Sequence, residues 1–194
     1  LALAAVLSVG CAFCVSADGS RTKDVTVSQE QSQIYEIIQK IEDTEGVKDL
    51  QQKYPTIAEA FQKVGEGKMD MPEFIDVLKA LATDEKDETL KAKLEEVIEK
   101  LDGKDFVTGF IQFKVLDSVK AVKNADGKYE VEFSVPSITD DMENIQLVCY
   151  NEETKEWTIV DPINVDKEKK TIKVALDDLC YFTIVADAKE DTAE

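Results

Sequence analysis

The segment KYEVEFSV, residues 128–135, decides how the second half of this chain folds. Its apolar side chains recur at every second position with polar ones between them, which is the pattern of a β-strand buried on one face. The change to this alternating period begins near Phe106 and continues to the end of the apolar sequence. We therefore predict strands over residues 107–115, 117–123, 128–135, 145–150, 156–160, 170–176 and 181–186.

Short polar connections separate these predicted strands. Residues 124–127 end in a glycine that tolerates positive φ, and residues 151–155 and 166–170 form two further turns. Strands spaced about 8–12 residues apart with polar turns are typical of antiparallel sandwiches. The sequence thus predicts an Ig-like antiparallel β-sandwich over residues 104–187 and a polar tail over 188–194. Its expected core residues include Phe133, Trp157 and Phe182.

Upstream of residue 104 the apolar side chains recur at helical spacing. Ser28 followed by Gln31 is a capping-box pattern, and isoleucines at 34, 37, 38 and 41 predict a helix that Gly46 stops. Further helices are expected over residues 47–64 and 87–101. Between them, Asp70 with Glu73 is a cap signal that predicts the start of another helix. A break at 54–56 is expected because Pro55 disfavours helix at the preceding residue, after which Thr56 can cap. The expected fold class is α+β, with a small N-terminal helical bundle over 28–103 docked on the sandwich.

The first segment, residues 1–17, contains no charged side chain and gives way to a polar linker over residues 18–27. Small residues up to Ala17 fit a signal-peptidase site, so we expect cleavage after Ala17 and export to the cell surface or medium. Three alternatives stay open: a buried helix, a lipoprotein anchored through Cys11 after Gly10, and a retained signal anchor. Because no basic residue precedes this segment and Leu1 stands first, we expect the natural N-terminus further upstream.

Charge composition excludes several classes of function. The 23 Lys and Arg residues against 41 Asp and Glu give a net charge of -18, and the chain has no histidine. Ser-His-Asp and Cys-His catalysis and His-ligated metals are therefore excluded. Nucleic acids and anionic membrane surfaces are poor partners for so acidic a chain. Since residues 1–17 are uncharged, the exported part carries the whole excess of acid. No transmembrane segment is expected in that part.

Two of the four cysteines, Cys149 and Cys180, lie in the predicted sandwich. An even pair in an exported domain suggests a disulfide between them. The alternative is a pair of buried thiols that pack as small hydrophobic groups.

Other local patterns carry little chemistry. Residues 66–74 resemble the second half of a calcium-binding loop, but Val64 falls where an oxygen ligand is required. The acidic clusters at 84–88, 140–144 and 177–178 match no defined cation loop, so we predict no catalytic residue, metal or cofactor. Strand tyrosines that bind sugar or peptide are a further hypothesis, with cross-strand packing as the more frequent explanation. They are Tyr129, Tyr150 and Tyr181.

The predicted strands also carry a family resemblance. The runs YEVEFSVP (129–136), IQLVCY (145–150), EWTIV (156–160), KTIKVAL (170–176) and DLCYFTIVA (178–186) resemble a recurrent C-terminal β-sandwich. That sandwich occurs in small uncharacterised secreted or surface proteins of gut Clostridia-type bacteria, and its strand order is distantly similar to ZU5-like sandwiches. Cys149-Tyr150 and Cys180-Tyr181 stand where those proteins often have His-Tyr and Ser-Pro. The resemblance implies an exported bacterial protein and carries over no functional residue.

Together these observations predict a non-catalytic surface or secreted module that binds a protein or glycan partner. The alternative is a hydrolase that acts on cell-wall or dietary glycan through a carboxylate pair. With 41 acidic residues in the chain, some carboxylate pair at a workable separation is expected in any fold, so such a pair alone is uninformative. A cleft lined by aromatic rings with a desolvated acid would favour the hydrolase, and an exposed apolar patch would favour the binding module.

Overall fold

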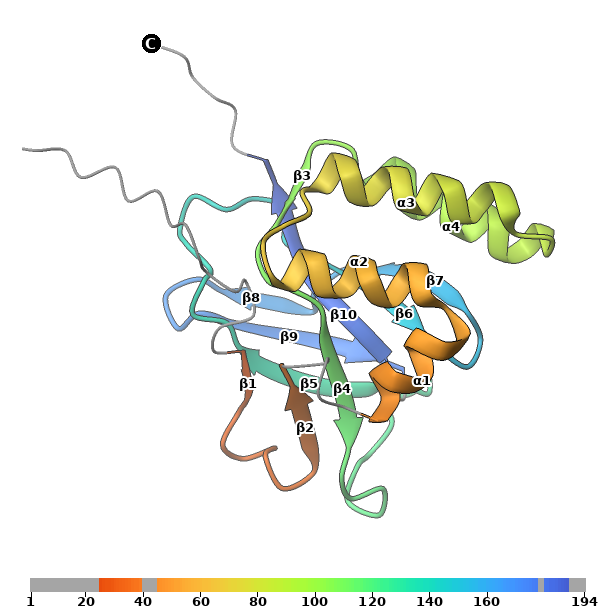
Figure 1. Ribbon diagram of the computed structural model, residues 1–194. Coiled ribbons are helices and arrows are strands. Elements are labelled where there is room, and N and C mark those ends of the chain that lie inside the picture. Colours follow the sequence, from red (N-terminus) through yellow and green to blue (C-terminus); the bar gives the residue numbers. More distant parts are fainter. Residues whose placement is uncertain (1–24, 40–44, 178–179, 189–194) are drawn as a thin grey trace, which may run out of the picture.

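The computed structural model describes residues 25–39, 45–177 and 180–188 (Figure 1). The predicted signal peptide, its cleavage site after Ala17 and the first part of the polar linker lie outside these residues, as does nearly all of the polar tail. The described chain forms four helices and two antiparallel sheets, so the fold is mixed α+β with a sandwich-like part. No helix in this part of the chain is both long enough and apolar enough to cross a membrane.

The smaller sheet has four strands. In spatial order they are β1 (Thr26–Val27), β5 (Tyr129–Ser134), β9 (Thr171–Leu176) and β8 (Asn164–Asp166). The strand β5 contains the segment that alternates most regularly in the sequence, and its side chains alternate between buried and half-buried as predicted. The predicted strands over 128–135 and 170–176 are confirmed, and β8 is an additional strand that the sequence analysis did not expect.

The larger sheet has six strands. Five follow the order β2 (Tyr35–Ile38), β4 (Ile111–Val115), β10 (Cys180–Asp187), β6 (Gln146–Asn151) and β7 (Glu156–Val160). The sixth, β3 (Lys104–Phe106), pairs with the far end of β10. Between β3 and β4 the ladder is interrupted, and there the hydroxyl of Thr108 accepts a hydrogen bond from the Ile184 amide at 3.0 Å. The buried interruption therefore keeps its polar groups satisfied.

Four helices cover one face of the larger sheet (Figure 1). They are α1 (Glu45–Lys53), α2 (Pro55–Gly65), α3 (Met71–Asp84) and α4 (Glu88–Leu101). Asp70 and Glu73 form the predicted capping box at the start of α3. The break at Tyr54 is also confirmed, although Tyr54 itself, without a side-chain cap, precedes α2 in place of Thr56. The caps and the proline therefore set these boundaries locally.

The larger sheet is buried on both faces, so it separates two cores. Val148, Tyr150 and Trp157 pack against the helices. Their neighbours Leu147 and Cys149 point to the opposite face and pack against the smaller sheet. A strand buried on both faces reads as a continuous apolar run, which explains the sequence LVCY in β6. The expected core residues are all buried, with Phe133 and Phe182 between the sheets and Trp157 under the helices.

The prediction of a helix beginning at Ser28 is wrong. Residues 28–34 form turns, and Tyr35–Ile38 is the strand β2, paired with β4. The side-chain amide of Gln31 does not cap a helix. It donates a hydrogen bond to the Glu130 carbonyl of β5 and accepts one from the Glu132 backbone amide. Tertiary pairing with an open sheet edge outweighs a weak local helical pattern rich in β-branched isoleucine. The polar linker likewise ends before Val25, which is fully buried, and Gly46 lies inside α1 and stops no helix.

The prediction of a strand over residues 117–123 is also wrong. This segment forms a turn in which the Asp117 carboxylate accepts hydrogen bonds from the amides of Val119 and Lys120. An Asp that bonds amides two and three residues later favours a turn over an extended strand. Val119 and Val122 of this segment are exposed, and Ala121 is half-buried, so its apolar residues do not form one buried face.

Candidate functional site

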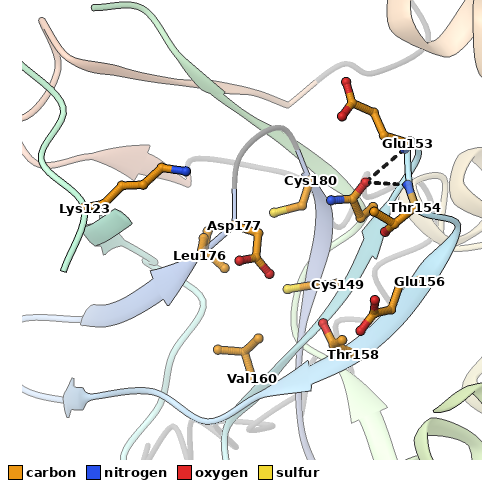
Figure 2. Close-up of a pocket in the computed structure, with 11 residues that line it drawn as sticks. Lys123, Cys149, Glu153, Thr154, Glu156, Thr158, Val160, Leu176, Asp177 and Cys180 are labelled. Atoms are coloured by element: carbon orange, nitrogen blue, oxygen red, sulfur yellow. Dashed lines mark hydrogen bonds between the residues drawn. The ribbon is translucent and has the colours of Figure 1, made fainter. Parts of the chain in front are cut away.

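A cavity of about 310 Å³ lies where the two sheets part, beside β6 and β7. Its floor includes Cys149, Cys180 and Thr158, and Asp177 lies at its rim just beyond the end of β9 (Figure 2). We call this cavity the dithiol pocket. It opens onto the face of the larger sheet that packs against the smaller one. Solvent therefore reaches part of that face.

Strand register explains why these side chains converge. Thr158 lies directly opposite Cys149, and Asn151 lies opposite Cys180. Residues opposite each other in an antiparallel pair point to the same face, as do residues two positions apart along one strand. Three strands, β10, β6 and β7, thus present small or polar side chains to one space.

The two cysteines are free thiols, and both are buried in the described structure. Cys149 lies opposite Phe182, so Cys180 is its diagonal neighbour on the same face. Hydrogen bonding with Cys180 and burial raise the pKa of the Cys149 thiol well above its ordinary value, and Asp177 adds to the increase while Lys128 opposes it. The structure therefore brings together the two residues singled out in the sequence. The disulfide between them stays a prediction.

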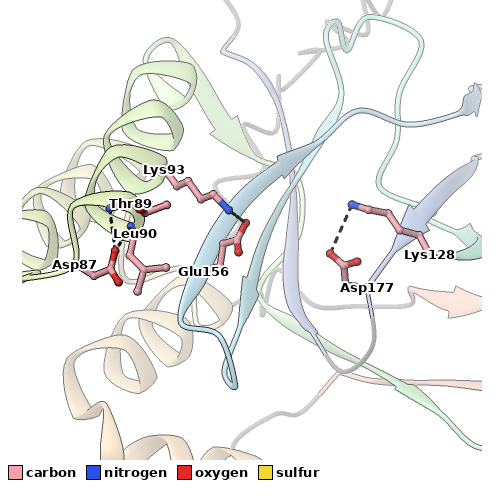
Figure 3. Close-up of polar contacts among 7 residues, drawn as sticks. All are labelled: Asp87, Thr89, Leu90, Lys93, Lys128, Glu156 and Asp177. Carbon is pink, nitrogen blue, oxygen red and sulfur yellow. Dashed lines mark hydrogen bonds and ion pairs between the residues drawn. The ribbon is translucent and has the colours of Figure 1, made fainter. Parts of the chain in front are cut away.

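Charged groups at the rim of the dithiol pocket are held by lysines from outside it. Glu156 pairs with Lys93 of α4 at 2.5 Å, and Asp177 pairs with Lys128 at 3.6 Å (Figure 3). The side-chain oxygen of Asn151 accepts hydrogen bonds from the backbone amides of Glu153 and Thr154, in the turn after β6. These contacts fix the rim and neutralise two of its carboxylates.

A second surface feature is the segment between β4 and β5, residues 116–122, which we call the apolar loop. Val119 is 91% exposed, Val122 76% and Leu116 50%. The loop is ordered by Asp117, which bonds two amides and pairs with Lys120 at 3.1 Å. The amide of Ala121 also donates to the Asp117 carbonyl at 2.9 Å. An ordered turn therefore presents three large apolar side chains to solvent.

The hypothesis that strand tyrosines face solvent is wrong. Tyr129, Tyr150 and Tyr181 are all buried. Tyr150 lies opposite Tyr181 on one side and opposite Trp157 on the other. Cross-strand packing, the alternative considered above, is the reason for these residues.

The acidic clusters of the sequence were considered above as possible cation ligands. Among the described residues, no group of three or more Cys, Asp or Glu side chains is arranged to hold a metal ion. The carboxyl oxygens of Asp70 and Glu73, within the segment that resembles a calcium loop, bond the backbone at the start of α3. These oxygens cap the helix.

Each described carboxyl group with a shifted pKa has it lowered. The first cause is a hydrogen bond from a lysine side chain, as for Glu96 beside Lys100 and Asp187 beside Lys104, except at Asp166, where it is a hydrogen bond from the Lys169 backbone amide. The other groups are Glu66, Asp117 and Glu130. A general acid for glycoside hydrolysis requires a raised pKa. These shifts have the opposite sign.

Sequence reasoning missed the polar side chains that line the dithiol pocket, and it missed the apolar loop. Glu156, Thr158 and Asp177 converge with the cysteines only through strand register, which the sequence does not specify. The loop did carry a usable signal, since Asp117-Ser118 is a pair that favours turns.

Comparison of the chain with protein-family models, with curated proteins and with solved structures finds no match.

Proposed function

We propose that this chain is an exported bacterial, non-catalytic interaction module that contacts a protein partner through its apolar loop. The observation that carries the proposal is the exposure of Leu116, Val119 and Val122 in one ordered turn. Single exposed apolar side chains are common, but a group of them marks a contact surface. Because the turn is already held by Asp117, little conformational entropy is lost when a partner binds.

A protein is the best-supported partner class. Glycan-binding sites rely on exposed aromatic rings, whereas the strand tyrosines and Trp157 are buried. An anionic membrane is disfavoured by the net charge of -18. Lys114 and Lys123 flank the loop, so the complementary surface is an apolar recess with carboxylates around it.

The remaining parts of the proposal rest on sequence. Export is supported by the uncharged apolar segment 1–17, and a bacterial origin by the resemblance to Clostridia-type sandwiches. The Ig-like character of the sheets and the bundle-like packing of the helices belong to the same proposal. The carboxylate-pair hydrolase is less well supported, because among the described residues no aromatic side chain lines the dithiol pocket and its Glu156 and Asp177 are paired with lysines.

Site-specific photocrosslinking tests this function. A benzophenone amino acid at Ser118, which is exposed between Asp117 and Val119, is expected to crosslink one discrete protein among the envelope and secreted proteins of the producing organism. The double variant Val119→Asp/Val122→Asp places two charges in the apolar loop and is expected to abolish the crosslinked product. Residues at the centre of an interface often contribute about 2 kcal/mol or more to the free energy of binding. The same probe at Glu88, exposed at the start of α4, is the matched control.

Two outcomes contradict the proposal. One is the same crosslinked product from Glu88 and from Ser118. The other is a product that persists in the double aspartate variant. Folding of that variant is checked by circular dichroism, and it is expected to be unchanged because both valines are largely exposed.

A further inference from the structure

We propose that Cys149 and Cys180 form a two-thiolate site for a soft, thiophilic cation, represented by Cu(I). The two cysteines share the floor of the dithiol pocket, where neighbouring strands β6 and β10 place them diagonally on one face. This inference concerns a different surface from the apolar loop, so either proposal can fail without the other.

Geometry supports coordination of an ion between the thiols. Cys149 lies opposite Phe182, and diagonal neighbours across an antiparallel pair are separated by about 7–8 Å between Cα atoms. Disulfides require Cα atoms within about 7 Å, so a diagonal pair lies at the limit of direct bonding. An ion that bridges two sulfur atoms accepts a wider separation. The cavity beside the thiols gives such an ion a path from solvent.

The set of ligands selects the kind of ion. Thiolates are soft ligands that favour Cu(I) and zinc, whereas calcium and magnesium require several oxygen ligands. Structural zinc takes four protein ligands. In the described part of the chain no third Cys, Asp or Glu joins the two cysteines as a metal-binding group, and the whole chain has no histidine. Two thiolates without further protein ligands suit Cu(I), which forms stable complexes with two sulfur donors.

Binding follows a balanced exchange of protons for metal. One Cu(I) ion replaces the two thiol protons, and the product is a copper dithiolate with one net negative charge and no change of oxidation state. The two released protons pass to solvent through the pocket. Lys123, which lines the pocket, favours that negative charge, whereas Asp177 at the rim opposes it.

Competition for Cu(I) tests the site directly. The background is the full chain with Cys11→Ser and Cys14→Ser, so that only the two pocket thiols remain. The reduced protein is titrated without oxygen into the coloured Cu(I)–bicinchoninate complex. We expect one equivalent of copper to be removed per chain, and Zn²⁺ to compete poorly for the same thiols. Copper binding is also expected to raise the melting temperature, because the ion binds the folded state.

Variants separate the thiols from their surroundings. Cys149→Ala and Cys180→Ala are each expected to weaken copper binding by more than about 100-fold, since even outer-shell partners of metal ligands contribute about 10–100-fold. Thr83→Val, which changes an exposed side chain of α3 outside the dithiol pocket, is the control and is expected to bind copper normally. Circular dichroism establishes that each variant is folded.

The proposal is overturned if the reduced, folded background protein leaves the bicinchoninate complex intact. It is also overturned if the chain with both alanines removes as much copper as the background, because the acidic surface is then the binder. A thiol assay before each titration establishes that both cysteines are reduced, so neither result can arise from a disulfide.

Discussion

At the scale of single residues, the position of a thiol determines its reactivity. The Cys149 side chain is 5% exposed and Cys180 2% exposed, although both line a cavity. Hydrogen bonding with Cys180 comes first among the causes that raise the Cys149 pKa, and burial comes second. The thiolate is the reactive form of cysteine, so a raised pKa lowers the reactive fraction at neutral pH.

We therefore predict slow alkylation of Cys149 in the folded protein. In the Cys11→Ser/Cys14→Ser background, the rate of iodoacetamide labelling at Cys149, measured by mass spectrometry, is expected to stay low at neutral pH. It should rise only at pH values above the ordinary thiol pKa. Cys180→Ala removes the leading cause and is expected to shift the rise to lower pH. The prediction is contradicted if, at neutral pH, Cys149 is labelled as fast in the folded protein as in the urea-unfolded protein.

At the scale of elements, one lysine joins three separate segments. Lys104, in β3, donates to the Asp187 carboxylate in β10 at 2.8 Å and to the Asn144 carbonyl at 2.8 Å. The side chain of Asn144 also donates to Asp187. Hydrogen bonds from Lys104 and then Asn144 lower the pKa of Asp187. The cluster therefore ties the helix-to-sheet connection to the last strand.

Asp187→Asn is expected to lower stability at neutral pH and to have no effect in strong acid. The folded pKa of Asp187 is depressed, so its stabilising effect is complete above the unfolded pKa and is lost as pH falls through the folded pKa. Asp187 is partly exposed, so the loss at neutral pH should be below about 1 kcal/mol. Urea unfolding of both proteins across acidic pH measures the difference. A constant difference at every pH contradicts the electrostatic explanation.

At the scale of the whole molecule, the helices and the sheets share a core. Phe61 of α2 stacks on Phe110 with ring centroids 3.8 Å apart and also contacts the rings of Tyr150, Trp157 and Tyr181. A two-layer sandwich and a separate helical bundle would each be small for independent stability. The shared aromatic cluster makes the helical layer part of the same cooperative unit.

Phe61→Ala is expected to reduce the free energy of unfolding by about 3–5 kcal/mol, the range for a large aromatic residue removed from a core. Because Trp157 is the single tryptophan and lies in this cluster, its fluorescence reports helix docking. The fluorescence and far-ultraviolet circular dichroism transitions of the unsubstituted chain are expected to coincide. Helices that unfold before the sheets would separate the two transitions. Val119→Asp serves as the control, with a change within about 0.5 kcal/mol.

Elements whose causes are local could be predicted from the sequence. The capping box of Asp70 and Glu73 and the proline at the start of α2 depend on neighbours along the chain, so they were predictable. The alternation in residues 128–135 likewise specified β5 and which of its side chains are buried. The uncharged character of residues 1–17 and the excess of acid are also properties of sequence alone.

Features that depend on partners distant in the sequence became visible in the folded chain alone. Ser28 and Gln31 carry a helical pattern, yet the open edges of β4 and β5 give this segment hydrogen bonds that local signals do not encode. The same holds for the dithiol pocket, because register between β10, β6 and β7 brings Cys149, Cys180 and Thr158 together. Local interactions act through neighbouring residues and are visible in the sequence. Register and sheet edges are set when separate segments pack, so their consequences appear only in the folded chain.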